Sequence, residues 1–220
     1  MEFKKAIEII ENKLADHQPL KLLSNNLTPS AIVIPFLEIK KEAHLLFTIR
    51  TDKVEHHKGQ ISFPGGAREI QDKSLKDTAI RECYEEVGIP KNMINIIGRF
   101  DDFPTITNFL VTPFAATIPY PYPKIINEKE VEDILEVPLE LFLTDKAFEV
   151  KQWQRKGKEY PVYFYYFKQN VIWGATAFIF NRFIEQIFDY NPAPKSILRD
   201  PSYEEYLKEN RTRKGKLNNS

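Results

Sequence analysis

The fold is decided by residues 59–89, which read GQISFPGGAREIQDKSLKDTAIRECYEEVGI. Residues 59–63 are predicted to form a β-strand that runs into a Pro-Gly-Gly turn. Gly65 and Gly66 permit positive φ angles and a close approach of the backbone to a ligand. A helix is predicted next, over residues 74–87. The stretch therefore predicts a strand, a glycine turn and a helix beside one cleft.

The predicted helix has clear start and stop signals. Ser74 and Asp77 are spaced as a capping box, and Gly88 is placed to end the helix. Residues on one arc of the helix are expected to face the core, and these are Ala79, Cys83 and Val87. Cys83 could act as a nucleophile, but its place in this apolar arc favours a buried, inert thiol.

Three glutamates crowd the adjoining face of the same helix. Glu82, Glu85 and Glu86 stand at positions i, i+3 and i+4, within roughly a 100° arc. Carboxylates this close repel one another unless a cation neutralises them. Hard oxygen ligands select Mg²⁺ or Mn²⁺ over Zn²⁺, and Arg81 can orient one carboxylate through a bidentate contact. By spacing alone, a solvated acidic helix face is the alternative.

The rest of the chain consists of strand-like and helix-like segments. Concentrations of β-branched and large apolar residues predict further strands at 30–39, 44–51, 94–103, 109–118, 130–137, 148–155 and 160–167. Residues 156–158 are typical of a hairpin turn. Amphipathic helices are predicted at 2–14 and at 174–188. Strands interrupted by helices without a regular βαβ rhythm indicate an α+β fold or a mixed α/β sandwich.

The central helix, taken with the strand and glycine turn before it, resembles the Nudix box. In that motif a Gly, a loop and a helix bearing R-E-U-x-E-E-x-G-U (U apolar) bind divalent cations over a diphosphate. The resemblance implies an α+β Nudix fold with a mixed β-sheet sandwiched between α-helices. It also implies that Glu82 and Glu86 are the principal Mg²⁺ or Mn²⁺ ligands and that Glu85 is a further ligand or outer partner. Arg81 would brace these catalytic carboxylates, and the Gly66 carbonyl would complete the metal shell.

The loop that leads to this helix is one residue longer than in the common form of the box. Counted from Gly66, Asp72 takes the place of the first glutamate of the box. Counted back from Arg81, Lys73 takes it, and the sequence does not choose between the two. The longer loop is itself a feature of the coenzyme A pyrophosphatases in this family.

Segments outside the box are similar to the same subfamily. They are residues 46–51 (LFTIRT), 57–66 (HKGQISFPGG), 111–114 (VTPF), 130–131 (EV), 137–139 (VPL) and 172–177 (IWGATA). The resemblance implies hydrolysis of the diphosphate linkage of coenzyme A, or of its derivatives, to 3′,5′-ADP and 4′-phosphopantetheine or an acyl-phosphopantetheine. Glu55 stands where the subfamily has a basic residue. The residues that could replace that basic group are Lys53, His56, His57 and Lys58.

Two roles in the implied hydrolysis stay open in the sequence. The candidates for binding substrate phosphates are Arg50, Lys58 and Arg68, with solvated side chains as the alternative. A general base must take a proton from the attacking water. It could be one of the three helix glutamates, or a carboxylate of a later loop such as Glu128 or Glu130.

The box alone does not fix the substrate. A Nudix hydrolase of ADP-ribose or another nucleoside diphosphate derivative carries the same box, and only the flanking segments favour coenzyme A. A Nudix regulator that binds a nucleotide without cleaving it is a third hypothesis, although such a binder does not need three mutually repelling carboxylates. The aromatic residues of 160–167 could stack an adenine, but core and hairpin packing is favoured.

Composition sets the outer limits. The 220 residues suggest one main domain, expected at 26–195, with a helical extension at 1–25 and a C-terminal helix and flexible tail at 196–220. Thirty-one basic residues balance 31 acidic ones, so nucleic acid is not an expected partner. No apolar run reaches the roughly 20 residues of a membrane span, the charged start is unlike a secretory signal, and a single cysteine suits a reducing compartment. We expect a cytoplasmic enzyme with a small-molecule substrate, and a homodimer stays open.

Overall fold

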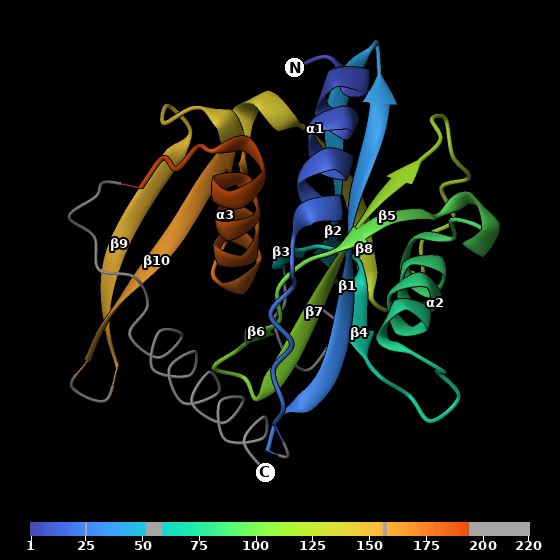
Figure 1. Ribbon diagram of the computed structural model, residues 1–220, viewed down its shortest axis with the longest axis horizontal. Helices are drawn as coiled ribbons and strands as arrows, with labels where there is room; N and C mark the ends of the chain where they lie inside the picture. The colour runs from blue at the N-terminus through green and yellow to red at the C-terminus, as the bar shows by residue number, and fades with distance from the viewer. Residues whose placement is uncertain (25, 52–58, 156–157, 194–220) are drawn as a thin grey trace.

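The computed structural model describes residues 1–24, 26–51, 59–155 and 158–193 (Figure 1). The helices in these residues are α1 (Phe3–Asp16), α2 (Leu75–Val87) and α3 (Ala175–Phe188), with short 3₁₀-helices η1 (Lys91–Met93) and η2 (Leu139–Leu143). The strands are β1 (Thr28–Ile39), β2 (Glu42–Arg50), β3 (Ile61–Ser62), β4 (Gly65–Ala67), β5 (Asn95–Arg99), β6 (Phe103–Pro104), β7 (Phe109–Ile118), β8 (Val131–Pro138), β9 (Phe148–Arg155), β10 (Lys158–Phe167) and β11 (Asn170–Trp173).

The larger of two sheets is mixed, as the resemblance implied. Its strand order is β3-β2-β1-β7-β5, and β4, β6 and β8 pair with β1, β7 and β2. β1 and β7 run parallel, whereas the other pairs are antiparallel. The smaller sheet has the order β11-β10-β9. The antiparallel pairing of β9 with β10 confirms the predicted hairpin, although residues 156 and 157 of its turn lie outside the described residues.

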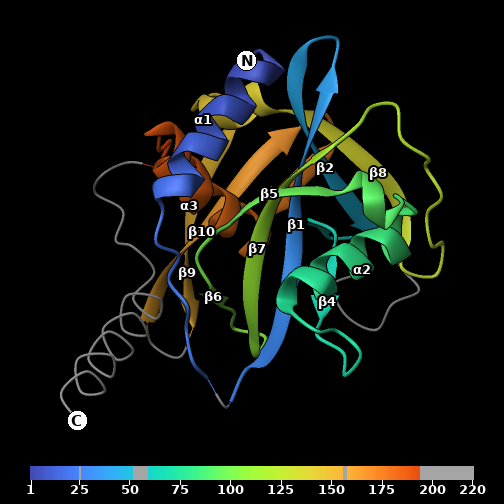
Figure 2. The ribbon, with the colours of Figure 1, turned by 45° about the vertical axis from the view of Figure 1, so that its right-hand side comes forward.

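Helices cover both faces of the larger sheet. α2 lies on one side of β1 and β7, whereas α1 and α3 lie on the other (Figures 1 and 2). Successive side chains of a strand point to opposite faces, and β1 uses both: Ala31 and Val33 pack with α2, whereas Ile34 and Phe36 pack in the core shared with α1 and α3. β1 is thus the buried strand against which α2 is fixed.

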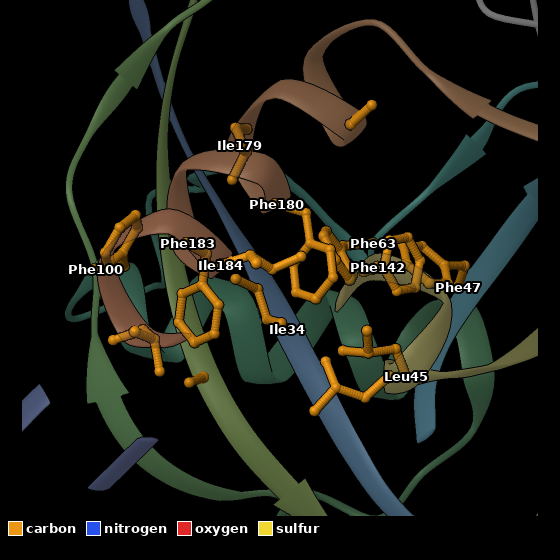
Figure 3. Close-up of a cluster of buried hydrophobic side chains, with 14 of the residues drawn as sticks. Ile34, Leu45, Phe47, Phe63, Phe100, Phe142, Ile179, Phe180, Phe183 and Ile184 are labelled. Atoms are coloured by element: carbon orange, nitrogen blue, oxygen red, sulfur yellow. The ribbon is translucent and has the colours of Figure 1, made fainter. Parts of the chain in front are cut away.

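An aromatic core fixes the chain just before the glycine turn (Figure 3). The Phe180 ring of α3 lies 5.5 Å from that of Phe63, 4.8 Å from that of Phe142 and 5.9 Å from that of Phe183, measured between centroids. Truncating such a buried Phe to Ala typically costs about 3–5 kcal/mol. Phe63 is the residue before the Pro-Gly-Gly turn, so this packing holds one end of the turn in place.

The predicted boundaries of α2 are confirmed. The Ser74 Oγ accepts a hydrogen bond from the Asp77 N–H at 3.2 Å. At the other end Gly88 adopts a φ of 76°, and its N–H donates to the Tyr84 carbonyl at 2.8 Å. A left-handed glycine of this kind ends a helix without the strain that a side chain would bring. The three residues predicted to face the core, Ala79, Cys83 and Val87, are fully buried.

The strand predicted at 94–103 is wrong as one continuous element. It is divided into β5 and β6, with Asp101 and Asp102 between them. Asp101 accepts a hydrogen bond from the Leu20 N–H at 2.7 Å, and Asp102 accepts one from the Leu22 N–H at 2.9 Å. These two carboxylates bind the segment that follows α1. The strand is therefore interrupted at the residues that make these contacts.

The other differences concern short elements. The strand predicted at 59–63 shortens to β3, because Gly59 lies in a turn with a φ of 66° and Pro64, which follows Phe63, has no N–H to donate. β4 and β11 were not predicted, since three and four residues are too few for a clear periodicity. The C-terminal helix and tail predicted for 196–220 lie outside the described residues. No described helix is long and apolar enough to cross a membrane.

Candidate active site

The three glutamates of α2 differ sharply in exposure. Glu86 is 2% exposed, the Glu82 side chain is 14% exposed and that of Glu85 is 49% exposed. The acidic face therefore runs from the interior to the surface along one side of α2. In Figure 2 this helix lies beside β4, the strand that contains the glycine turn.

Gly65 and Gly66 lie directly against two of these carboxylates. The Gly65 N–H donates to Glu86 Oε2 at 3.2 Å. A Cβ atom on Gly66 would lie 2.5 Å from Glu82 Cδ, closer than real Cβ contacts. Pairing with β1, where Gly66 is opposite Ala31, holds β4 at this distance. The two glycines thus allow the close approach that the sequence predicted.

Arg81 joins the loop before α2 to two of the helix glutamates. Its Nη1 donates to Glu82 Oε1 and to Glu85 Oε2, both at 2.9 Å. Its Nη2 also donates to the Ala67 carbonyl at 3.0 Å. The predicted bidentate contact exists, but on another carboxylate: Nε and Nη2 donate to the two oxygens of Asp72 at 3.0 and 2.9 Å.

Of the two candidates in the lengthened loop, Asp72 is the one whose carboxylate pairs with Arg81. Its carboxylate is buried and also accepts hydrogen bonds from the Glu69 N–H at 2.9 Å and the Thr78 Oγ1 at 3.0 Å. Hydrogen bonds from Arg81 hold the pKa of Asp72 well below its usual range, and Asp72 raises the pKa of Arg81 further. Both groups are thus charged at neutral pH. The Lys73 side chain is exposed.

Burial disfavours the charged form of two of these carboxyl groups. Burial raises the pKa of Glu86 to about 8, and the charge of Glu82 adds to this shift; a backbone hydrogen bond and the charge of Arg50 oppose it. Burial also raises the pKa of Glu82, against the effect of Arg81. Glu130, on the loop before β8, raises the pKa of both glutamates. A nearby cation would favour the charged form of such a group and lower its pKa again.

These groups have the chemistry of a divalent-cation site. Carboxylate and carbonyl oxygens are the ligands that Mg²⁺ and Mn²⁺ prefer. As the side chains stand, no three His, Cys, Asp or Glu residues of the described chain enclose an ion, and one oxygen of Glu82 is bonded to Arg81. A cation beside Glu86 would offset the cost of burying the ionised form of this carboxyl group. Glu82 and Glu86 fit a metal site by donor type and charge, whereas the role of the Gly66 carbonyl stays a prediction.

Arg50 is the predicted phosphate-binding residue that the structure brings to the carboxylates. It lies at the end of β2, and its Nη1 is 3.9 Å from Glu86 Oε1. Its Nε is buried and has no hydrogen-bond partner among the described residues. A guanidinium has five N–H donors in a planar fork that suits a phosphate. Arg50 therefore has an unpaired donor, Nε, and lies beside Glu86.

The structure does not bring Arg68, another predicted phosphate-binding residue, to the carboxylates. The Arg68 guanidinium is held by main-chain carbonyls: Nη2 donates to that of Asp72 at 3.0 Å and to that of Lys73 at 3.3 Å. Arg68 thus supports the loop before α2. Lys58 lies outside the described residues, and so do the alternatives Lys53, His56 and His57 and the unusual Glu55.

Cys83 and the buried tyrosines of β10, for which functional roles were considered, belong to the core. Burial raises the pKa of the Cys83 thiol to about 12, so it is protonated at neutral pH and is no nucleophile. In the aromatic run of β10, Tyr163 and Tyr165 are buried, and Tyr165 lies 4.9 Å from the Phe142 ring. Core packing accounts for both tyrosines.

Sequence reasoning missed the residue that fixes the later loop. Of the two proposed loop carboxylates, Glu128 is exposed, whereas Glu130 is partly buried and acts on the α2 glutamates. Asn127 donates from Nδ2 to Glu130 Oε1 at 3.3 Å, and its N–H donates to the Glu86 carbonyl at 3.1 Å. The only sequence signal is an Asn three residues before a Glu at the start of a strand, which is too common to single out.

Comparisons with known proteins agree with this geometry. The family model described as the NUDIX domain matches residues 26–160. A protein of Photorhabdus laumondii named "Uncharacterized Nudix hydrolase NudL" is 36% identical over 169 residues, which cover 77% of this chain and 90% of that protein. A Yersinia pestis protein of the same name is 33% identical over 158 residues, covering 72% of this chain and 79% of that one.

A solved structure, a MutT/nudix family protein from Enterococcus faecalis, superposes with a TM-score of 0.46 at 16% identity, covering 86% of this chain and 74% of that one. Sequence similarity carries the assignment, because the match to the family model spans more than half of the chain and includes α2 and the glycine turn. With its mixed sheet between helices and its row of glutamates on α2, the chain belongs to the Nudix hydrolase family.

Proposed function

We propose that this chain is a metal-dependent coenzyme A diphosphatase. It would cleave the diphosphate linkage of coenzyme A, or of a derivative, to 3′,5′-ADP and 4′-phosphopantetheine or its acylated form. The observation that carries the hydrolase part is the buried Glu86 carboxylate, which has the Gly65 N–H on one oxygen and Arg50 beside the other. A carboxylate that can bind a metal ion thus lies next to an arginine that can bind a phosphate.

Nudix hydrolases generally use divalent metal ions, and here Glu82 and Glu86 would hold Mg²⁺ or Mn²⁺. When bound, such an ion neutralises the charge of a diphosphate and lowers the pKa of a water molecule. Arg50 would bind a phosphate of the substrate through its guanidinium group. Arg81 keeps Glu82 and Glu85 oriented. The proton of the attacking water would go to an α2 glutamate or to Glu130.

The segments around the site support coenzyme A as the substrate. Those that are similar to coenzyme A pyrophosphatases lie in β2, in the chain from residue 59 to β4, in β7, in β8 and at the junction of β11 with α3. β2 contains Arg50, and β8 begins next to Glu130. β11 packs beside β3, which runs into the glycine turn. The similarity thus extends over the elements that surround the carboxylates.

A substrate panel tests the proposal. The protein is incubated with Mg²⁺ or Mn²⁺ and with coenzyme A, its disulfide, an acyl thioester, ADP-ribose or NADH, and products are separated by chromatography. We expect 3′,5′-ADP from coenzyme A or a derivative, and none from the Glu86→Gln variant. Cleavage of ADP-ribose alone would overturn the coenzyme A assignment, and binding without cleavage of any compound would indicate a regulator.

A further inference from the structure

A pocket of about 520 Å³ lies at the carboxyl ends of β1 and β7, which run parallel. The described residues that line it come from the start of α1, from these two strands and the turns that follow them, from η1 and from the start of β5; none of them belongs to α2 or β4. Small-molecule sites commonly have volumes of roughly 300–1,000 Å³. The pocket is therefore large enough for a ligand of its own, apart from the candidate active site.

The floor of the pocket lies on the face of the larger sheet opposite α2. Phe36 of β1 packs in the core shared with α1 and α3, and Glu38, two residues further along the strand, points to the same side. Thr117 pairs with Phe36 on one side and with Asn95 on the other, and the Asn95 Nδ2 donates to the Thr117 Oγ1 at 3.2 Å. The floor thus offers a carboxylate, a hydroxyl and an amide on the α1 side of the sheet.

Two lysines line the pocket from the turn between β1 and β2. Ile39 pairs with Glu42, so Lys40 and Lys41 form the whole hairpin loop. Both have left-handed backbones, with φ angles of 52° and 69°. Two-residue turns of this kind strongly prefer Asn followed by Gly, because the left-handed conformation strains most residues that carry a Cβ atom. The turn itself gives no reason for two lysines, which points to a role of their ammonium groups.

The first residues of the chain hold this turn in place. The Phe3 N–H donates to the Lys41 carbonyl at 2.8 Å, and the Ala43 N–H donates to the Met1 carbonyl at 2.9 Å. Figure 1 shows the start of α1 beside the tip of this hairpin. Neither Lys40 nor Lys41 has a side-chain hydrogen bond or ion pair with another described residue. Both ammonium groups are therefore available to a ligand at a fixed turn.

Apolar side chains complete the lining. Tyr120 is 46% exposed in the loop after β7, and its ring meets that of Tyr122 edge-on with the centroids 6.1 Å apart. Phe3 and Met93 also line the pocket, and both are partly buried. Aromatic rings and a polarisable thioether provide a surface on which the flat base of a nucleotide can stack.

We propose that this pocket is a second ligand site, which binds a nucleoside monophosphate away from the α2 carboxylates. Its two lysines outnumber its one carboxylate, so the lining attracts an anion, and Lys40 and Lys41 bind the phosphate. Glu38 accepts hydrogen bonds from the ribose hydroxyls, as acidic residues do in dinucleotide sites. The base lies against Tyr120 and Met93. Free phosphate or a nucleoside uses only part of this lining and therefore binds more weakly.

Titration calorimetry with AMP in EDTA tests the site without metal or turnover. The double variant Lys40→Asn/Lys41→Gly removes both ammonium groups and gives the turn its preferred residues. We expect it to raise the Kd for AMP about tenfold or more, the scale of a hydrogen bond to a charged group. Its melting temperature should not fall, because the backbone strain is relieved. Lys168→Asn is the matched control, since Lys168 is exposed with a φ of 53° in the turn between β10 and β11, and it should keep the wild-type Kd.

Two single variants test which part of the ligand binds where. Glu38→Gln should weaken the binding of AMP but not that of inorganic phosphate, because only the ribose contacts this carboxylate. Arg50→Gln should keep the wild-type Kd for AMP, because Arg50 lies beside Glu86 in the candidate active site and does not line this pocket. In the wild type, AMP should bind more tightly than either inorganic phosphate or adenosine.

The second site is refuted if the wild type does not bind AMP, or if Lys40→Asn/Lys41→Gly binds it with the wild-type Kd. Loss of AMP binding in Arg50→Gln would also refute it, because the nucleotide would then bind at the α2 carboxylates. Inorganic phosphate that binds as tightly as AMP would overturn the assignment of a nucleotide. A failure to cleave coenzyme A changes none of these results, because neither metal nor turnover enters the titrations.

Discussion

Replacing Glu86 by Gln should make the metal-free protein more stable at alkaline pH. Burial raises the pKa of Glu86 from 4.5 to about 8 in the folded chain, so the folded state holds this proton more tightly than the unfolded state does. The resulting stabilisation is fully present below about pH 4.5 and is lost as the pH rises through about 8. Over that window the wild type loses roughly 3–5 kcal/mol of unfolding free energy through this one group.

The variant has no proton to lose at this position, and its neutral amide fits the same space. At pH 5 the two proteins should therefore have similar unfolding free energies in EDTA. At pH 8.5 Glu86→Gln should be more stable by about 3 kcal/mol. Urea unfolding followed by circular dichroism, at several pH values between 5 and 9, gives the difference curve, in which the other titrating groups largely cancel.

Glu85→Gln is the matched control, because Glu85 lies one residue away but is half exposed and bonded to Arg81. Its difference curve should be flat at alkaline pH. Adding Mg²⁺ should stabilise the wild type, since a ligand of the folded state alone shifts the unfolding equilibrium, and should leave Glu86→Gln nearly unchanged while turnover is lost. Parallel pH curves for the wild type and Glu86→Gln would refute a buried, uncompensated carboxylate at this position.

Three further perturbations test the surroundings of the site. Gly66→Ala should weaken Mn²⁺ binding in calorimetry, because the new Cβ would displace Glu82; unchanged affinity contradicts the close packing. Asp72→Asn should lower the unfolding free energy at pH 7 by about 3 kcal/mol, because it breaks the buried pair with Arg81. This difference should shrink as the pH falls below about 4, because protonation of Asp72 in the unfolded chain then removes the stabilisation that the pair gives the wild type. Cys83 should resist a disulfide reagent in the folded protein at pH 7.5 and react after unfolding, so modification of the folded chain would exclude its burial.

The sequence predicts α2 and its surroundings well, because the determinants are local. Capping by Ser74, the stop at Gly88 and the apolar arc are set by residues within a few turns of one another. The same holds for the glycine turn, whose two residues meet carboxylates of the following helix. The choice between Asp72 and Lys73 was not local, since it depends on how a loop of irregular backbone folds back onto Arg81.

Long-range contacts account for what the sequence did not predict. The break between β5 and β6 follows from carboxylates that bind a segment some 80 residues earlier, as in the bond between Leu22 and Asp102. The role of Asn127 depends on a loop that packs on α2 from the far end of β7. Neither contact leaves a periodic pattern in the chain, and periodicity is the main signal that a single sequence offers.

The contacts of Arg81 explain how Glu82 could exchange its bond to Arg81 for a cation without disturbing the arginine. Arg81 has two bonds to Asp72 and one to the Ala67 carbonyl in addition to its bonds to Glu82 and Glu85. If Glu82 turned toward a cation, the guanidinium would keep four of its five contacts and stay in place. A lysine, with one nitrogen and no planar fork, could not hold Asp72 and release Glu82 independently. Arg81 can thus keep its bonds to Asp72 and Ala67 when Glu82 moves to bind a ligand.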